Sequence, residues 1–124
     1  MKKKNIKKLC FDIDNTICST NKNHYFSSKP NFKGIKKINN LFEKGFFIIL
    51  FTSRFMGRNN ENINLAKKKG FKFTTKQLKS WNVKYHKLIF GKPSFDLIID
   101  DKSIYFKKTW YKDIDNYLIK KKDK

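Results

Sequence analysis

Short apolar runs alternate along the chain with segments in which apolar residues recur at helical spacing. Residues 8–12 form a short apolar run that ends in acid, and FFIILF at 46–51 is continuously apolar. A continuous run of this length is typical of a strand buried on both faces in a parallel sheet. Residues 87–90 and FDLII at 95–99 are similar, and the last run again ends in acid. We therefore expect these four segments to form a parallel sheet.

Helical patterns occupy the intervals between the expected strands. Residues 32–44 carry apolar side chains at helical spacing, and Gly45 stands where a helix would stop. We expect a second helix over residues 61–69 that ends at Gly70, followed by a short strand at 71–73. Thr75 is then expected to cap a further helix carrying Leu78, Trp81 and Val83, and a last helix is expected over 109–119. Alternating strands and helices predict an α/β domain in the form of a three-layer α/β/α sandwich with a central parallel sheet.

The length of 124 residues fits one domain, expected to span 1–124 with solvated tails at 1–5 and 120–124. No apolar run approaches the ~18 residues of a membrane span. The basic N-terminus is not followed by an apolar stretch of signal-peptide length, because Asp12 and Asp14 interrupt it. We therefore expect a cytoplasmic protein in which Cys10 and Cys18 are free thiols.

The formal net charge of +20 suggests nucleic acid as a partner, because clustered basic residues release counterions from a phosphate backbone. Two observations weaken this interpretation. Only Arg54 and Arg58 are Arg, and Lys lacks the planar fork that reads guanine or grips phosphate bidentately. The Lys excess also accompanies many Asn, Ile and Phe, the mixture that an AT-rich genome encodes. Nucleic acid is not the favoured main partner, although a positive field would attract any anionic substrate.

Acidic and hydroxyl side chains follow three of the expected strands. Asp12 and Asp14 follow the first, Thr52 follows the second, and Asp100 with Asp101 follows the last. Ligands of open α/β sheets bind outside the carboxyl ends of the strands. Carboxylates gathered there would repel one another unless a cation lies among them. Oxygen ligands of this kind suit Mg²⁺, which takes one or two carboxylates plus a substrate phosphate.

Four motifs in this order resemble those of the haloacid dehalogenase (HAD) superfamily. They are DIDNT at 12–16, FIILFT ending at Thr52, Lys92 within GKPSFD, and the acid pair of LIIDD. The resemblance extends over residues 7–104. It implies a Rossmann-like core, and the intervals between the motifs leave no room for a cap domain. The chain is also similar to small HAD phosphatases encoded with bacterial capsule or surface-polysaccharide genes.

The resemblance implies a role for each matched residue. Asp12 would be the nucleophile that forms an aspartyl-phosphate, and Asp14 the general acid and base. Thr52 would hydrogen-bond the phosphoryl oxygens, and Lys92 would neutralise charge on the nucleophile and phosphate. The Mg²⁺ ligands would be the Asp12 side chain, the Asp14 carbonyl and Asp100 with Asp101. An Asp at position 14 is typical of phosphatases and phosphomutases within the superfamily.

Four neighbours of these residues are candidates for substrate binding: Asn15, Thr16, Ser53 and Arg54. Many relatives have Gly where this chain has Asn15, but Asn tolerates left-handed backbone. Ser53 and Thr52 could instead cap a following helix. Arg54 could grip a second anionic group, and an exposed Arg at a helix start is the alternative.

The function expected from the resemblance is Mg²⁺-dependent hydrolysis of a phosphomonoester. The expected substrate is a phosphorylated sugar, a sugar nucleotide or a similar metabolite of surface-polysaccharide synthesis. Two alternatives stay open: a phosphatase that acts on polynucleotide ends, and a non-catalytic basic protein that binds nucleic acid. Capless relatives often assemble into dimers or tetramers, so a homo-oligomer is one expected state.

Overall fold

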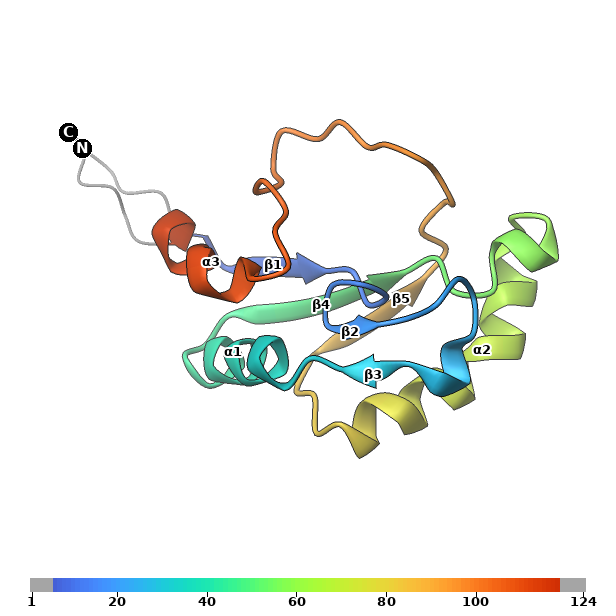
Figure 1. The fold of residues 1–124 in the computed structure, drawn as a ribbon, viewed down its shortest axis with the longest axis horizontal. Coiled ribbons are helices and arrows are strands. Elements are labelled where there is room, and N and C mark those ends of the chain that lie inside the picture. The colour runs from blue at the N-terminus through green and yellow to red at the C-terminus, as the bar shows by residue number, and fades with distance from the viewer. Residues whose placement is uncertain (1–5, 119–124) are drawn as a thin grey trace.

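A parallel sheet forms the centre of the molecule (Figure 1). The computed structural model describes residues 6–118, so the expected tails at 1–5 and 120–124 lie outside the described residues. Within that range the sheet has the strands β1 (Lys8–Phe11), β4 (Phe47–Thr52) and β5 (Lys87–Phe90), in the order β1-β4-β5. Both pairings are parallel, with Leu9 beside Ile48 and Leu50 beside Leu88. The parallel sheet predicted from the apolar runs is confirmed for these three strands.

Three α-helices accompany the sheet: α1 (Phe32–Glu43), α2 (Ile63–Ser80) and α3 (Trp110–Leu118). The Asn31 side chain accepts a hydrogen bond from the Gly34 amide at 3.1 Å and so caps the start of α1. The predicted first and last helices are confirmed, except that Ile119 lies outside the described residues. The remaining elements are a two-stranded pairing of β2 (Cys18–Ser19) with β3 (Lys29–Pro30) and two 3₁₀ turns, Tyr25–Ser27 and Gly57–Asn59.

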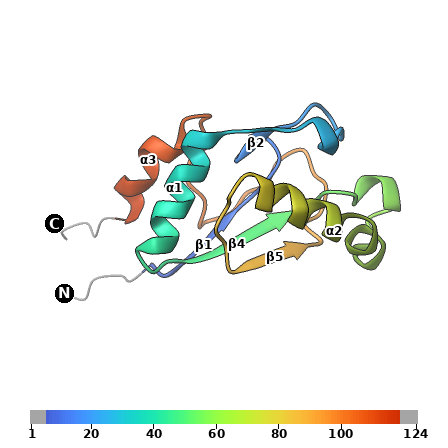
Figure 2. The same cartoon turned by 90° about the horizontal axis from the view of Figure 1, so that it is seen from below.

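Helices α1 and α2 both lie on one face of the sheet (Figure 2). The strand order advances in one direction, and successive crossovers of the same hand then place both connecting helices on the same side. The side chains of Ile48 and Leu50 face these helices and are fully buried. Trp110 of α3 packs against Phe11 on the same side, with ring centroids 5.3 Å apart. The main core therefore lies between the sheet and its helices.

The opposite face of the sheet carries no helical layer among the described residues. Ile49 and Phe51 of β4 are half-buried there, and Cys10 of β1 is exposed. The sequence predicted a strand buried on both faces and a three-layer sandwich, whereas β4 is fully buried on one face only. A strand beyond β1 would reverse the direction of the strand order and place its connection on this second face. That strand is not present in the described chain.

The strand expected at residues 95–99 is an irregular segment. Residues 91–109 connect β5 to α3 and arch over the second face of the sheet (Figure 1). The side chains of Leu97 and Ile99 are 79% and 92% exposed. A short apolar run becomes a strand only when its backbone finds a neighbouring strand, and apolar character alone does not specify that neighbour. The prediction of a strand at 95–99 is therefore wrong for this structure.

Helix α2 is continuous where the sequence predicted a helix, a strand and a second helix. Gly70 does not end it, and Thr75 lies inside it. A Cβ atom at position 70 would come within 2.3 Å of the Phe55 ring, so Gly70 serves close packing and not termination. Phe71 and Phe73 were predicted as strand. They lie two positions apart within α2, so their side chains leave the helix on different sides.

Trp81 and Trp110 are both buried, as their helical spacing suggested. Cys10 and Cys18 are free thiols, as expected. No helix within residues 6–118 combines the length and the apolar character that crossing a membrane requires.

The exposure of the connecting segment leads to a direct test. Ile99→Asp is expected to change the free energy of unfolding by no more than about 0.5 kcal/mol, because the side chain contacts solvent. The control is Leu50→Ala in the core, which is expected to cost about 2–5 kcal/mol. Urea denaturation followed by circular dichroism measures both changes. A loss in Ile99→Asp as large as that in Leu50→Ala would mean that residues 95–99 are packed in solution.

Candidate functional site

The expected chemistry gathers at the carboxyl end of the sheet. Strand β1 ends at Phe11, and Asp12 is the next residue. Phe11 is paired with Leu50 of β4, so Asp12 and the strand-ending Thr52 leave the sheet at the same edge. The parallel pairing thereby places the first two predicted motifs side by side.

Asp12 has an ammonium group and a hydroxyl group as partners. Lys92 Nζ lies 3.1 Å from Asp12 Oδ1, and the Thr16 hydroxyl donates a hydrogen bond to Asp12 Oδ2 at 3.3 Å. Burial raises the pKa of Asp12 above its ordinary value of 3.8, although Lys92 lowers it by charge and by hydrogen bonding. The Asp12 side chain remains 31% exposed. It is therefore a carboxylate that a ligand in solution can reach.

The backbone after Asp12 turns sharply and is anchored by apolar side chains. Ile13 and Ile17 are fully buried, and the Ile17 amide donates to the Ile13 carbonyl at 2.9 Å. Asn15 lies between them with φ of 64°, the left-handed backbone expected for it. The Trp110 indole donates to the Thr16 carbonyl at 2.8 Å. The turn is thus fixed from the core side while Asn15 itself is exposed.

Asp14 is held by Arg54 in a bidentate ion pair. Arg54 Nε donates to Asp14 Oδ2 at 2.9 Å, and Arg54 Nη2 donates to Asp14 Oδ1 at 2.9 Å. The Arg54 side chain has no exposed surface, whereas that of Asp14 is 20% exposed. A fully buried guanidinium needs such a partner, because an unpaired buried charge is strongly unfavourable.

The rest of the Arg54 guanidinium is enclosed by α2 and by the loop before β3. Arg54 Nη1 donates to Gln77 at 2.7 Å and to Thr74 at 3.4 Å. The Tyr25 ring covers the guanidinium at 4.8 Å from its centroid. Arg54 was predicted as a substrate-binding residue or an exposed residue at a helix start. It is neither in this structure, because the groups around it occupy its donors and exclude solvent.

Asp14 accepts further hydrogen bonds. The Thr20 hydroxyl donates to Asp14 Oδ1 at 2.6 Å and lies 2.6 Å from the Ser28 hydroxyl. Every polar partner of the Asp14 carboxylate is a donor, and both oxygens are engaged by Arg54. A proton transfer through Asp14 therefore requires that one of its oxygens leave Arg54.

Thr52 connects the two ion pairs. Its hydroxyl accepts a hydrogen bond from the Arg54 amide at 3.1 Å, and its carbonyl accepts one from the Lys92 amide at 3.1 Å. Thr52 is 1% exposed, so its hydroxyl has almost no access to solvent in this structure. Ser53 is half-buried in the same loop.

Asp100 and Asp101 do not join this cluster. Both are exposed in the segment between β5 and α3, and Lys102 Nζ lies 3.6 Å from Asp101 Oδ2. Among residues 6–118 there is no group of three or more acidic, His or Cys side chains that could hold a metal ion. The convergence of four carboxylates predicted from the sequence depended on a strand at 95–99. Without that strand, Asp12 and Asp14 stand without the other two.

Several residues that shape the site were not among the candidates predicted from the sequence. Thr74 and Gln77 are polar residues three positions apart on the inner side of α2, and that placement is the signal that points to a buried polar partner. Thr20 and Ser28 have no such signal, because they lie in a loop whose path depends on the β2–β3 pairing.

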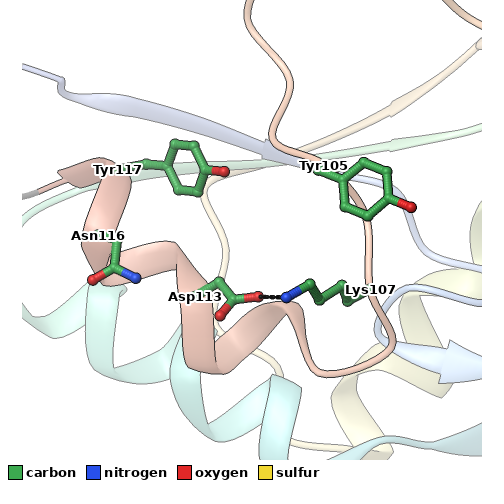
Figure 3. A pocket seen from close by; sticks show the side chains of 5 residues that line it. All are labelled: Tyr105, Lys107, Asp113, Asn116 and Tyr117. Carbon is green, nitrogen blue, oxygen red and sulfur yellow. Dashed lines mark ion pairs between the residues drawn. The ribbon is translucent and has the colours of Figure 1, made fainter.

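A hollow of about 530 Å³ lies elsewhere, between α3 and the segment that precedes it (Figure 3). It is lined by Tyr105, Lys107, Asp113, Asn116 and Tyr117, and Lys107 is 3.5 Å from Asp113. None of the predicted site residues contributes to it.

Comparison of the chain with protein-family models and with curated proteins gives no match. Among solved structures, the fold is similar to that of a crystallised target protein from Vibrio cholerae. The two chains are 25% identical, the match covers 85% of this chain and 86% of the other, and the TM-score is 0.76. The likeness supports a small α/β fold with a parallel sheet.

The buried ion pair predicts a large cost for removing Arg54. Arg54→Met leaves the Asp14 carboxylate without its main partner, and breaking a buried pair costs about 3–5 kcal/mol. Because Asp14 is partly exposed, we expect a value near the lower end, measured by urea denaturation at neutral pH. The matched control is Arg58→Met, which removes an exposed Arg that has no carboxylate partner among the described residues. Equal, small losses in the two variants would contradict the ion pair.

Proposed function

We propose that this protein is a phosphomonoester hydrolase that uses Asp12 as its nucleophile and Mg²⁺ as its cofactor. The observation that carries the proposal is a partly exposed carboxylate at the carboxyl end of a parallel sheet, with an ammonium group 3.1 Å away. This is the edge at which open α/β sheets bind ligands. Positioning and charge neutralisation are what phosphoryl transfer chiefly requires.

The residues divide the reaction between them. An Asp12 oxygen attacks phosphorus and forms a new P–O bond, while the bond from phosphorus to the ester oxygen breaks. Asp14, once released from Arg54 and protonated from solvent, gives that proton to the leaving oxygen and then takes one from the water that hydrolyses the aspartyl-phosphate. Lys92 balances negative charge beside Asp12. Thr52 donates to a phosphoryl oxygen, and Asn15, Thr16 and Ser53, which adjoin Asp12 and Thr52, are the proposed substrate-binding residues.

A cysteine nucleophile is disfavoured. Burial raises the pKa of the Cys18 thiol, and partial desolvation in β1 raises that of Cys10 although its residue is exposed, so the reactive thiolate is less populated at both. The Cys18 sulfur lies beside Asp14 Oδ1, whose negative charge raises the pKa further. Asp12 is the nucleophilic side chain that faces solvent at this edge.

Magnesium fits the donor set in part. Mg²⁺ commonly takes one or two carboxylates, several waters and a substrate phosphate, and the Asp12 side chain with the Asp14 carbonyl offers the protein share. Asp100, with Asp101, would complete the ligand set that the resemblance implies, and Asp100 is close enough to Cys10 of β1 that, besides desolvation, its charge raises the pKa of that thiol. When bound, the ion neutralises charge on the transferring phosphoryl group.

The proposed substrate is a phosphorylated sugar, a sugar nucleotide or a similar metabolite, in the cytoplasm. This class rests on the similarity to capless phosphatases of surface-polysaccharide synthesis. A polynucleotide end is the second candidate, favoured by the net charge of +20. The third candidate function is binding of nucleic acid without catalysis. It does not explain why Lys92 is paired with a partly exposed Asp12.

Asp12→Asn is expected to lower the rate of aryl phosphate hydrolysis by about a thousandfold or more, because the amide cannot attack phosphorus. Stability should not fall with it. The pKa of Asp12 is raised on folding, so its ionised form disfavours the folded state as the pH rises through and above 3.8. The Asn variant should therefore unfold at the same or a higher temperature at neutral pH. The matched control is Asp96→Asn, an exposed carboxylate outside the site. Undiminished turnover in Asp12→Asn would refute the nucleophile.

Removal of divalent ions is expected to stop the reaction. Purified protein treated with EDTA should lose hydrolysis of the same aryl phosphate, and added Mg²⁺ should restore it, because the ion neutralises the transferring group. Steady-state rates before and after the addition measure the effect. Full activity in EDTA would exclude Mg²⁺ while leaving the role of Asp12 to the preceding experiment.

A further inference from the structure

The outer side of α2 is a continuous basic surface. Its inner side is formed by Ala66, Gly70, Thr74 and Leu78, which are all buried. With 3.6 residues per turn, the opposite side carries five exposed lysines, Lys68, Lys69, Lys72, Lys76 and Lys79, here named the α2 lysine stripe. The stripe extends about 16 Å along the helix axis.

The charges of the stripe are not balanced within the described chain. Helix α2 contains no Asp or Glu, and none of the five lysines lies within 4.0 Å of a carboxylate among residues 6–118. Lys68, Lys72 and Lys76 follow one another at a spacing of four residues, and like charges at that spacing destabilise a helix. By contrast, Lys37 of α1 pairs with Asp115 of α3 at 2.7 Å. The stripe therefore has the charge of a surface that is complementary to a polyanion.

Aromatic side chains border the stripe. Phe73 lies four residues after Lys69 and three before Lys76, so it is their neighbour on the helix surface. The Phe26 ring packs on Phe73 with centroids 4.4 Å apart, and Phe26 is 79% exposed. An exposed aromatic ring beside a row of cations is the combination that binds single-stranded nucleic acid, because bases stack while cations contact phosphates.

The same aromatic pair adjoins the candidate site. The Phe73 ring centroid lies 5.9 Å from the guanidinium carbon of Arg54, which in turn holds Asp14. The middle of the stripe therefore adjoins the ion pair that holds Asp14.

A lipid surface fits this helix less well. Helices that lie on membranes insert an apolar side into the bilayer interface. The apolar side of α2 is packed against β5 and the Phe55 loop, with Ala66 and Leu78 fully buried. The exposed surface along residues 68–79 is mainly charged, and the exposed apolar side chains of α2, namely Ile63, Leu65 and Phe71, do not form a side opposite to the lysines as a membrane-bound helix requires.

We propose that the α2 lysine stripe, together with Phe26 and Phe73, is a binding surface for single-stranded nucleic acid. The surface is independent of hydrolysis at Asp12. Its existence would not require that nucleic acid be the substrate, although it would present a polynucleotide end to the site.

The test compares two triple variants that change the net charge equally. The first replaces Lys69, Lys72 and Lys76 by Gln, and the matched control replaces Lys33, Lys36 and Lys112, which are exposed on other helices. Binding of a fluorescein-labelled oligothymidine is measured by anisotropy across a range of salt concentrations. The stripe variant should lose about tenfold in affinity, and its salt slope should fall by about 2, since each phosphate contact contributes ~0.7 for single strands. The control should change the affinity by less than about twofold.

A second variant tests stacking without altering charge. Phe26→Ala removes an exposed ring, so the fold is retained, and it should weaken oligothymidine binding about fivefold or more. Inorganic polyphosphate and vesicles containing phosphatidylserine are the competing probes.

Equal losses in the two triple variants would overturn the proposal, because net charge alone would then explain binding. So would an unchanged affinity in Phe26→Ala combined with polyphosphate or vesicle binding as tight as that of the oligonucleotide. Absence of oligothymidine binding by the unaltered protein would overturn it as well. Asp12→Asn should bind oligothymidine normally, so failure of the phosphatase proposal and failure of this one are distinguishable.

Discussion

The buried ion pair between Arg54 and Asp14 is the constraint on which the arrangement of the site depends. Arg54 has no exposed side-chain surface, and its donors reach Asp14, Gln77 and Thr74. These partners come from the turn after β1 and from α2, which are far apart in the sequence. One guanidinium therefore fixes the acidic turn, the loop after β4 and helix α2 relative to one another. The chemistry of the site is built on a group that does not itself face solvent.

This pairing divides the two acids of DIDNT by environment. Asp12 is accessible, and its cation is a flexible Lys. Asp14 is less exposed, and its cation is a fully buried, planar Arg that engages both oxygens. In the proposed reaction, the carboxylate that attacks phosphorus must be accessible to the substrate, as Asp12 is. The carboxylate that exchanges protons must be held in a fixed orientation, as Asp14 is. The proposed reaction then depends on how readily Asp14 exchanges Arg54 for a substrate or water.

Local patterns predicted the parts of the fold that local forces determine. The helix at 32–44 has both an amphipathic pattern and an N-cap, and the strand at 46–51 has an unambiguous apolar run, so both were located within a residue or two. Gly70 misled the prediction, because a glycine that ends a helix and one that admits a neighbouring ring look the same in sequence. The run at 95–99 misled it too, since strand formation depends on a pairing partner that no local pattern specifies.

Motif order and strand ends predicted where Asp12 and Thr52 lie, at the carboxyl end of the sheet, and Lys92 lies beside Asp12; the roles of the three residues stay predictions. The burial of Arg54 was not predictable, because it arises from contacts with Gln77 and Tyr25, which lie 23 and 29 residues away in the sequence. Asp100 and Asp101 were expected at this edge because a strand was predicted at 95–99. Without that strand, they lie exposed in the segment between β5 and α3.

The close approach of Gly70 to Phe55 has a consequence for how this protein tolerates change. Phe55 follows Arg54 directly and has a left-handed backbone with φ of 65°, an unusual conformation for a bulky residue. Its ring occupies the space that a side chain at position 70 would need. A methyl group added at position 70 would displace the Phe55 ring and, through it, the loop in which Arg54 holds Asp14. Amino-acid substitution at position 70 of α2 is therefore restricted, although this position lies outside the candidate site.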